Sequence, residues 1–237
     1  MLLATIREGA AHGLRRGRVL RLFLWSWTAG WIGARLWFVV EHRAVLEGPR
    51  WPWLFHPAAG GFSSYGGLLA AVAVAVGYAR LAKLPVPALL DSGAVGLCLF
   101  GIAARLGCFL AGCCYGRPSE LPWAVTFPLD SPAARRFGEG VGVHPTQLYE
   151  AAALAVIAVW VACRPNVVPG ARFLRVAAYY SVVRFLLDGF RGDAAVQGGA
   201  LSTAQWASLL VLTVSAGLLW VAGRYSSWRV RATVSPC

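Results

Sequence analysis

The stretch that decides the fold is Ala88–Gly112, which reads ALLDSGAVGLCLFGIAARLGCFLAG. It runs for 25 residues with only two charged side chains, Asp91 and Arg105. About 20 apolar residues are enough for a helix to cross the hydrocarbon core of a bilayer. The glycines and alanines of this stretch let neighbouring helix backbones approach closely, as is typical of helices packed together inside a membrane. The sequence therefore predicts a central transmembrane helix here.

Further apolar runs of similar length flank this one on both sides. They are residues 19–40, 62–79, 147–163, 173–190 and 201–222. The 237-residue chain is 58% hydrophobic and 14% charged, whereas soluble domains carry about 25% charged residues. This composition excludes a disordered chain and an ordinary soluble domain. We expect an all-α, polytopic transmembrane helical bundle of about six spans, forming a single integral membrane domain over residues 1–237 with structured outer loops at 41–61 and 117–144.

The positions of the basic residues predict the orientation of the bundle, because Lys and Arg collect on the cytoplasmic side of membrane proteins. With the N-terminus inside, the inner segments carry the whole net charge of +12, while the outer loops and the spans each sum to zero. Residues 1–18 are then a basic cytoplasmic segment and residues 223–237 a cytoplasmic tail. Since topology accounts for the charge, no nucleic-acid partner is expected.

Three arginines, Arg35, Arg105 and Arg184, lie inside predicted spans. On insertion scales each costs about 2.5–3.5 kcal/mol at the centre of a span. One interpretation is structural: these side chains snorkel, or pair with Glu150 and Asp188. The other is that they hold an anion, since all three fall in the outer half of their spans and guanidinium binds phosphate bidentately. The phosphate available at that depth belongs to an anionic phospholipid.

Three cysteines, Cys108, Cys113 and Cys114, cluster where the central span reaches the outer face. Their spacing matches neither the usual zinc pattern nor the C-x-x-C redox pattern. A structural role, a disulfide, a nucleophilic or redox thiol and a metal site all remain open interpretations. His144, at the start of the fourth span, is either a general base or a structural residue of the helix start.

Four sequence blocks resemble the prolipoprotein diacylglyceryl transferase family of bacterial membrane enzymes. In chain order they are Tyr65-Gly66-Gly67-Leu68, Arg105 to Arg117 with Leu121-Pro122-Trp123 after it, His144-Pro145-Thr146-Gln147-Leu148-Tyr149-Glu150, and Arg184 to Arg191. The resemblance implies a multi-pass enzyme of the bacterial cytoplasmic (inner) membrane, with both termini cytoplasmic. It also implies the reaction: transfer of diacylglyceryl from phosphatidylglycerol to the lipobox cysteine thiol of a prolipoprotein, with release of glycerol phosphate and no metal or other cofactor.

The resemblance also implies roles for single residues. Arg105 and Arg184 become ligands of the head group and of the leaving phosphate, and Tyr65 and His144 become candidates to take the thiol proton. The implied substrate-binding residues are Arg35, Gly66, Gly67, Arg117, Gln147, Tyr149, Glu150, Asp188 and Arg191. Three positions depart from the family pattern: Tyr65 stands in place of a histidine, Cys108 in place of an asparagine and Cys113 in place of a glutamate.

These departures leave two alternatives beside the transferase. One is a divergent relative that uses Cys108, Cys113 or Cys114 for thiol-based or redox chemistry on another lipid or acceptor. The other is a non-enzymatic binder or transporter of anionic lipids, for which paired Gly or Pro breaks in two halves of the chain would be typical. Substitution of the cysteines separates the first two readings, because the plain transferase reaction does not require these thiols.

Overall fold

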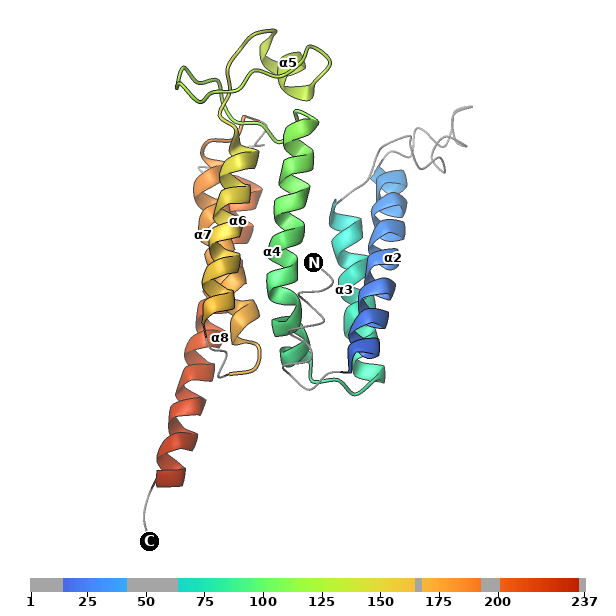
Figure 1. Cartoon of the computed structure of the whole chain (residues 1–237), viewed down its shortest axis with the longest axis vertical. Coiled ribbons are helices and arrows are strands. Elements are labelled where there is room, and N and C mark those ends of the chain that lie inside the picture. The colour runs from blue at the N-terminus through green and yellow to red at the C-terminus, as the bar shows by residue number, and fades with distance from the viewer. Residues whose placement is uncertain (1–14, 42–63, 165–167, 193–200, 235–237) are drawn as a thin grey trace. The chain divides into compact units, whose positions relative to one another are not determined.

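The computed structural model describes residues 15–41, 64–164, 168–192 and 201–234, and about three quarters of these residues are helical (Figure 1). The helices are α2 (Arg16–Glu41), α3 (Ser64–Leu81), α4 (Val86–Leu110), α5 (Pro132–Phe137), α6 (Thr146–Cys163), α7 (Ala171–Asp188) and α8 (Thr203–Val234). Each predicted span coincides with one long helix to within a few residues, except that α8 continues to Val234. The short helix α5 is an addition to the predicted set.

The helices match a membrane environment in length and composition. α4, α6 and the part Thr203–Arg224 of α8 are long and apolar enough to cross a bilayer, and Leu69–Leu81 of α3 is a shorter apolar segment. α2 and α7 contain more charged residues, which lowers their mean hydropathy below that of the other long helices.

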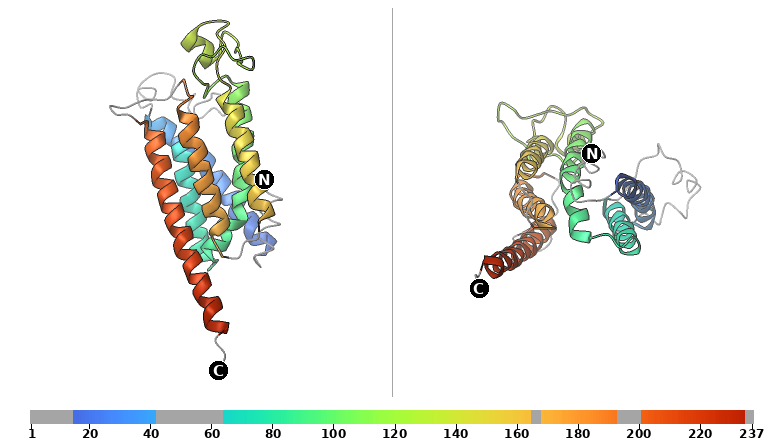
Figure 2. Two further views of the ribbon diagram at one scale, coloured as in Figure 1. Left: turned by 90° about the vertical axis from the view of Figure 1, so that its left-hand side faces the viewer. Right: turned by 60° about the horizontal axis from the view of Figure 1, so that its bottom comes forward.

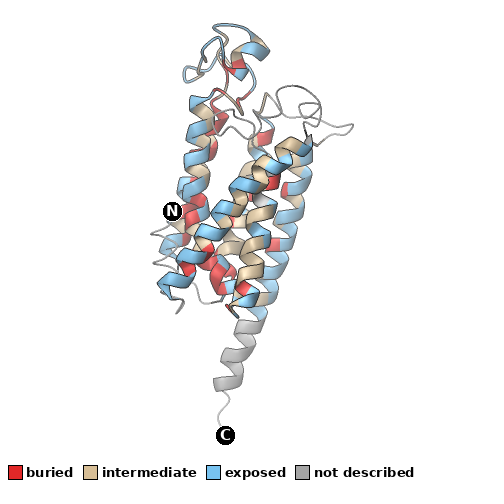
Figure 3. Ribbon diagram, turned by 90° about the vertical axis from the view of Figure 1, so that its right-hand side faces the viewer, coloured by how far each residue is buried: buried red, intermediate tan, exposed pale blue. Residues whose placement is uncertain are grey.

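Large apolar side chains cover the outside of the helices instead of being hidden between them. Exposed residues run along the helices in Figure 3, and only 17% of the most apolar window of α4 is buried. Water would make such a surface costly, because continuous apolar patches of this extent are rare on soluble proteins. Lipid removes this cost, so the prediction of a helical membrane protein is confirmed. Examples of these exposed residues are Leu97, Phe100, Val156, Val159, Leu210 and Leu218.

The chain divides into two compact units, residues 6–89 and residues 90–237. In the first unit, α2 packs directly on α3. Glycines allow this contact: a Cβ added to Gly33 would lie 2.6 Å from the carbonyl oxygen of Gly66. A larger residue at either position would push the two helices apart.

In the second unit, α7 packs against both α6 and α8 (Figure 2). Its buried apolar core joins α4, α6 and α7. The core residues are Ala94, Cys98, Leu154, Ile157, Ala158, Val161 and Val176. This packing fixes the three helices that carry the charged residues described below.

One buried acid sets the start of α7. Asp91 of α4 is fully buried, and its carboxylate accepts hydrogen bonds from the backbone N–H groups of Gly170 (2.6 Å) and Phe173 (2.9 Å). A carboxylate at a helix N-terminus satisfies unpaired N–H groups and interacts favourably with the helix dipole. Asp91 therefore clamps α7 to α4 at the opposite end of α7 from Asp188.

The segment between α4 and α6 has a small core of its own, as predicted for a structured loop. Tyr115, Ala133 and Val143 are buried there, and Phe127 and Phe137 pack against them. Backbone bridges join Val143 to Pro118 and to Val125. These contacts give the loop a defined path from the end of α4 to the start of α6.

Candidate active site

Arg105 is held in place by a buried acid. Its Nε lies 3.0 Å from Oε1 of Glu150 on α6, and the hydroxyl of Tyr180 on α7 donates a 2.6 Å hydrogen bond to the same oxygen. Glu150 is 2% exposed, whereas the Arg105 side chain is 21% exposed. A buried carboxylate needs such partners to offset its desolvation. The network therefore joins three helices and leaves part of the guanidinium open to its surroundings.

Arg184 is held in the same way. Its Nη1 lies 3.0 Å from Oδ1 of Asp188, one turn further along α7, and the hydroxyl of Ser202 donates a hydrogen bond to Oδ2 of Asp188. Asp188 is 4% exposed, and the Arg184 side chain is 20% exposed. Within the described residues, Nη1 of Arg184 has no hydrogen bond with acceptable geometry, although it is buried. The ion pair with Asp188 therefore fixes the guanidinium, and its exposed part can face an anion.

Ser202 is itself fixed by the start of α8. Its backbone N–H donates to Oε1 of Gln205 (2.9 Å), and the backbone N–H of Gln205 donates to the Ser202 hydroxyl oxygen (3.1 Å). This reciprocal pair is a capping box, the arrangement that stabilises helix N-termini. The capping box orients the hydroxyl that holds Asp188.

The two arginine sites lie at neighbouring levels of one helix face. Tyr180 and Arg184 are four residues apart on α7, so their side chains project from the same face about 6 Å apart along the axis. Tyr180 contacts Glu150, which binds Arg105. The predicted pairing with Glu150 and Asp188 is therefore present, and both guanidinium groups are fixed on one side of α7.

A hydrogen-bonded trio surrounds His144. The indole Nε1 of Trp123 donates a 2.8 Å hydrogen bond to the hydroxyl oxygen of Tyr149, and Nδ1 of His144 lies 3.3 Å from that oxygen. The ring of His144 also packs edge-on against Phe190, with 5.5 Å between the ring centroids. These contacts orient the imidazole, which is half-buried.

The backbone around Gly116 joins three of the sequence blocks. The N–H of Gly116 donates to the carbonyl of His144 (3.0 Å), and the N–H of Arg117 donates to the carbonyl of Phe190 (2.8 Å). A Cβ at Gly116 would lie 2.6 Å from the His144 carbonyl oxygen, so only glycine fits. This junction sets the backbone positions of Arg117 and of Arg191, which is bridged to Gly116.

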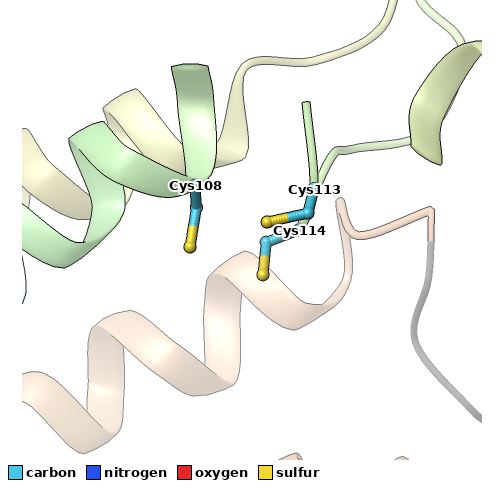
Figure 4. A group of neighbouring side chains, drawn as sticks. All are labelled: Cys108, Cys113 and Cys114. Atoms are coloured by element: carbon cyan, nitrogen blue, oxygen red, sulfur yellow. The ribbon is translucent and has the colours of Figure 1, made fainter. Parts of the chain in front are cut away.

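The thiol cluster consists of Cys108 near the end of α4 and of Cys113 and Cys114 in the loop that follows (Figure 4). Their sulfur atoms all lie within 4.8 Å of one another, and all three residues are half-buried. Burial, and after it the neighbouring thiols of Cys114 and Cys108, raise the pKa of the Cys113 thiol to about 12. This shift is opposite to the lowered pKa that is typical of reactive cysteines.

The start of α6 anchors this cysteine-bearing loop. Nε2 of Gln147 donates a 2.7 Å hydrogen bond to the carbonyl of Cys113, and the hydroxyl of Thr146 donates a 2.9 Å bond to the carbonyl of Cys114. Gln147 is 1% exposed, and its Oε1 has no partner among the described residues. Two buried side chains of α6 therefore fix the positions from which the thiols project.

The remaining predicted site residues lie in the other unit, residues 6–89. Gly66 and Gly67 lie at the close contact between α3 and α2. The guanidinium of Arg35 lies 5.8 Å from the centre of the Phe38 ring. Their predicted roles in substrate binding, and the role of Tyr65, stay predictions. The side chain of Tyr65 lies outside the described residues.

Two surface depressions lie away from Arg105 and Arg184. One of about 540 Å³ is lined by α6 residues from Ala155 to Cys163 and by Arg164, and the other of about 420 Å³ by Pro118–Glu120, Val141 and Gly142. The arginine sites are thus partly exposed positions on the helices and not the walls of either depression.

Sequence reasoning assigned no site role to three side chains that position the site: Tyr180, Ser202 and Trp123. The sequence could have indicated Tyr180, because it lies four residues before Arg184 in the same predicted helix and therefore on the same face. Ser202 and Gln205 form the S-x-x-Q pattern of a capping box at the start of the last span. The bond from Trp123 to Tyr149 had no such signal, because it depends on the path of the loop.

Comparison with known proteins relates most of the chain to one family. Residues 1–221 match the family model described as prolipoprotein diacylglyceryl transferase. A phosphatidylglycerol–prolipoprotein diacylglyceryl transferase 2 of Clostridium perfringens is 28% identical over 89% of this chain and 81% of its own length. A relative of the same activity name from Streptomyces coelicolor is 30% identical over 97% of this chain and 67% of its own. One from Geobacter sulfurreducens is 38% identical over 58% of this chain and 51% of its own length.

The matched region contains every residue of the two arginine sites, the His144 trio and the thiol cluster. Most of the chain, and not one motif alone, is therefore shared with these transferases. The chain belongs to the prolipoprotein diacylglyceryl transferase family.

Proposed function

We propose that this chain transfers a diacylglyceryl group from phosphatidylglycerol to the cysteine thiol of a prolipoprotein. Relatives that bear the name of this activity match most of the chain, which supports the reaction class. The observation that carries the proposal is the pair of guanidinium groups of Arg105 and Arg184, each fixed by a buried carboxylate on one side of α7. Such a pair suits the phosphate of an anionic phospholipid.

The reaction develops negative charge on the leaving phosphate. The acceptor sulfur attacks the glycerol carbon that bears the phosphate, so that a C–S bond forms while the C–O bond breaks. Glycerol phosphate leaves with the electron pair. Preorganised donors stabilise this charge without having to reorganise as it develops. Glu150 and Asp188 supply the preorganisation for Arg105 and Arg184, and the exposed part of each guanidinium is the donor for the phosphate.

The acceptor thiol must lose its proton, and His144 is our candidate for the base. In the required tautomer, Nδ1–H of His144 donates to the Tyr149 oxygen, which leaves the lone pair of Nε2 for the substrate. The bond from Trp123 keeps Tyr149 in place. Tyr65, at the position of the family histidine, is the second candidate, although a phenol has a reference pKa near 10.

The other predicted residues receive positioning or binding roles in this proposal. Tyr149 orients His144, and Gln147 orients the cysteine loop. Arg117 and Arg191, brought together at Gly116, add positive charge for the head group. Arg35, Gly66 and Gly67 are proposed contacts of the lipid from the α2–α3 unit.

We further propose that the reaction takes place at the outer leaflet of the bacterial inner membrane, with both chain termini in the cytoplasm. The whole net charge of +12 falls on the inner segments in this orientation, in agreement with the tendency of Lys and Arg to remain on the cytoplasmic side. Arg105, Glu150 and Arg184 then lie toward the outer ends of their helices.

The test is lipidation of a lipobox peptide by the purified full-length protein in vesicles. Vesicles containing phosphatidylglycerol should yield a peptide whose mass increases by one diacylglyceryl group, whereas pure phosphatidylcholine vesicles should yield none. A peptide with serine in place of the lipobox cysteine is the matched control. If the Clostridium perfringens relative modifies the peptide in the same vesicles and this protein does not, the proposed function is wrong.

A further inference from the structure

Three thiols converge in the described part of the chain, and the roles proposed above do not use them. The sulfur atoms of Cys108, Cys113 and Cys114 lie within 4.8 Å of one another. Cys114 has a positive φ of 58°, a conformation that non-glycine residues adopt rarely. The loop therefore takes an unfavourable backbone conformation at one of the residues that bring the thiols together.

The backbone that carries the cluster is fixed by buried partners. Gln147 and Thr146 bind the carbonyls of Cys113 and Cys114, and the N–H of Cys113 donates to the carbonyl of Cys108 (3.1 Å). Metal sites need this kind of support, because groups outside the ligand set hold the ligands in position. The thiols are thus preorganised as a set of three.

Three cysteine sulfurs make a ligand set for a soft or borderline metal ion. Thiolates favour zinc among the common divalent ions, and zinc binds them at about 2.3 Å in a tetrahedral arrangement. That geometry puts neighbouring sulfurs about 3.8 Å apart, so small rotations of the side chains convert the observed cluster into a site. Three protein ligands leave a fourth position open, as in catalytic zinc sites.

The charge around the cluster suits such a centre. Zn²⁺ with three thiolates carries a net charge of −1, and a fourth thiolate would make it −2. Arg105 is close enough to Cys108 and Cys114 to interact with both electrostatically. Its positive charge compensates the anionic centre.

A disulfide explains the cluster less well. A disulfide uses two of the three thiols, so it does not account for the position of the third. It would also require an oxidant or reductant, whereas diacylglyceryl transfer involves no net oxidation or reduction. The departures from the family pattern occur at Cys108 and Cys113, and two new thiols beside Cys114 complete a set of three.

We propose that Cys108, Cys113 and Cys114 bind one zinc ion, and that its open position binds the lipobox cysteine of the prolipoprotein as a thiolate. This inference rests on the proposed function. The acceptor thiol gives its proton to His144 as it coordinates zinc. Its sulfur then attacks the glycerol carbon, the C–O bond to phosphate breaks, and the thioether product leaves the metal. The metal thus supplies the activated thiol in a chain that has Tyr65 where the family has histidine.

Metal content is the first test. Full-length protein purified in detergent, with the reduced thiols kept under inert gas, should contain about one zinc per chain. Single substitutions Cys108→Ser, Cys113→Ser and Cys114→Ser should each lower the content at least tenfold. Cys163→Ser is the matched control, because Cys163 is exposed at the far end of α6, and it should retain zinc. Thermal unfolding of each variant checks that it is folded.

Cobalt makes the substrate contact visible without any turnover. Replacement of zinc by Co²⁺ should give the absorption bands of a tetrahedral cobalt thiolate site. A lipobox peptide with cysteine should shift these bands, whereas the serine peptide should not. Cobalt bands that the cysteine peptide leaves unchanged would overturn the assignment of the fourth position.

The outcomes separate this inference from the proposed function. Removal of zinc by a chelator should lower lipidation at least tenfold, and added Zn²⁺ should restore it. Full lipidation by metal-free protein overturns the inference and leaves the function standing. Zinc that binds in a protein that never lipidates the peptide overturns the function and leaves the metal site standing. A disulfide among the three cysteines in protein that binds no zinc overturns the metal site.

Discussion

Arg105 and the thiol cluster are anchored by successive turns at the start of α6, yet they differ in how closely they follow the family pattern. Glu150 binds Arg105, while Thr146 and Gln147, one turn earlier, bind the loop that carries Cys113 and Cys114. The arginines and their acids resemble the family, whereas Cys108 and Cys113 replace its asparagine and glutamate. The start of α6 thus serves two tasks: one turn holds an arginine that resembles the family pattern, and the turn before it holds the loop whose cysteines depart from that pattern.

The largest expected effect is on the lipidation rate, when either guanidinium group is removed. Arg105→Ala and Arg184→Ala should each slow lipidation by about 10²–10³-fold, the usual cost of removing one preorganised donor to a developing oxyanion. Zinc content should not change in Arg184→Ala. The rate in phosphatidylglycerol vesicles is the measurement, and Arg164→Ala, which removes an exposed arginine stacked on Trp160, is the control. Equal rates in all three variants would remove the arginines from the mechanism.

The next effect concerns the buried acids. Glu150→Gln leaves the partly buried Arg105 without its counter-charge, so the free energy of unfolding should fall by up to about 3–5 kcal/mol. Glu139→Gln, an exposed acid in the loop, is the matched control. Thermal unfolding followed by tryptophan fluorescence measures the difference. An unchanged melting temperature for Glu150→Gln would show that the ion pair does not hold the helices.

Gln147→Ala should affect the thiol cluster and spare the arginines. It removes a buried hydrogen bond that fixes the Cys113 carbonyl, and loss of such a supporting group lowers metal affinity about 10–100-fold. Cobalt titration of the purified protein measures this change. Gln205→Ala, at the start of α8, is a control that should leave cobalt binding intact. If the two variants bind cobalt equally, Gln147 does not organise the cluster.

Gly116→Ala tests the backbone junction at which Gly116 contacts His144 and Arg191. The new methyl group would meet the His144 carbonyl at 2.6 Å, and such overpacking typically costs about 1–3 kcal/mol. Gly107→Ala is the matched control, because nothing lies within 4 Å of its added Cβ. Thermal unfolding should separate the two variants, and equal melting temperatures would contradict the close approach at Gly116.

The smallest effect is expected far from both regions, at the N-terminus of α7. Asp91→Asn keeps one hydrogen-bond acceptor but loses the charge that interacts with the helix dipole, which is worth about 0.3–2 kcal/mol. The melting temperature should fall slightly while the lipidation rate at low temperature stays the same. A large loss of activity at unchanged stability would give Asp91 a role that its contacts with α7 do not explain.

The helices could be predicted because lipid imposes a simple rule on the sequence: about 20 apolar residues for each crossing. The boundaries of α4 and α6 followed from this length and from the polar residues at their ends. α5 could not be predicted in this way. Its six residues depend on the cap from Ser131 and on the packing of Ala133 against the loop core.

The ion pairs of the site could also be predicted, because charges inside apolar spans must find partners. Arg105 with Glu150 is such a case. The contacts of Thr146 and Gln147 could not, since their acceptors are backbone carbonyls whose positions depend on the left-handed conformations of Gly112 and Cys114. The convergence of the three sulfurs required the folded loop as well.

The central claim is that Arg105 and Arg184 act on one lipid phosphate, and a double-mutant cycle tests it most directly. Lipidation rates are measured for the wild type, Arg105→Ala, Arg184→Ala and the double variant in phosphatidylglycerol vesicles. When two groups act as a unit, removing the second costs little further rate once the first has been removed. We therefore predict that the double variant is less than about tenfold slower than the slower single variant. A loss equal to the product of the two single losses would contradict the claim, because it would mean that the two arginines act independently.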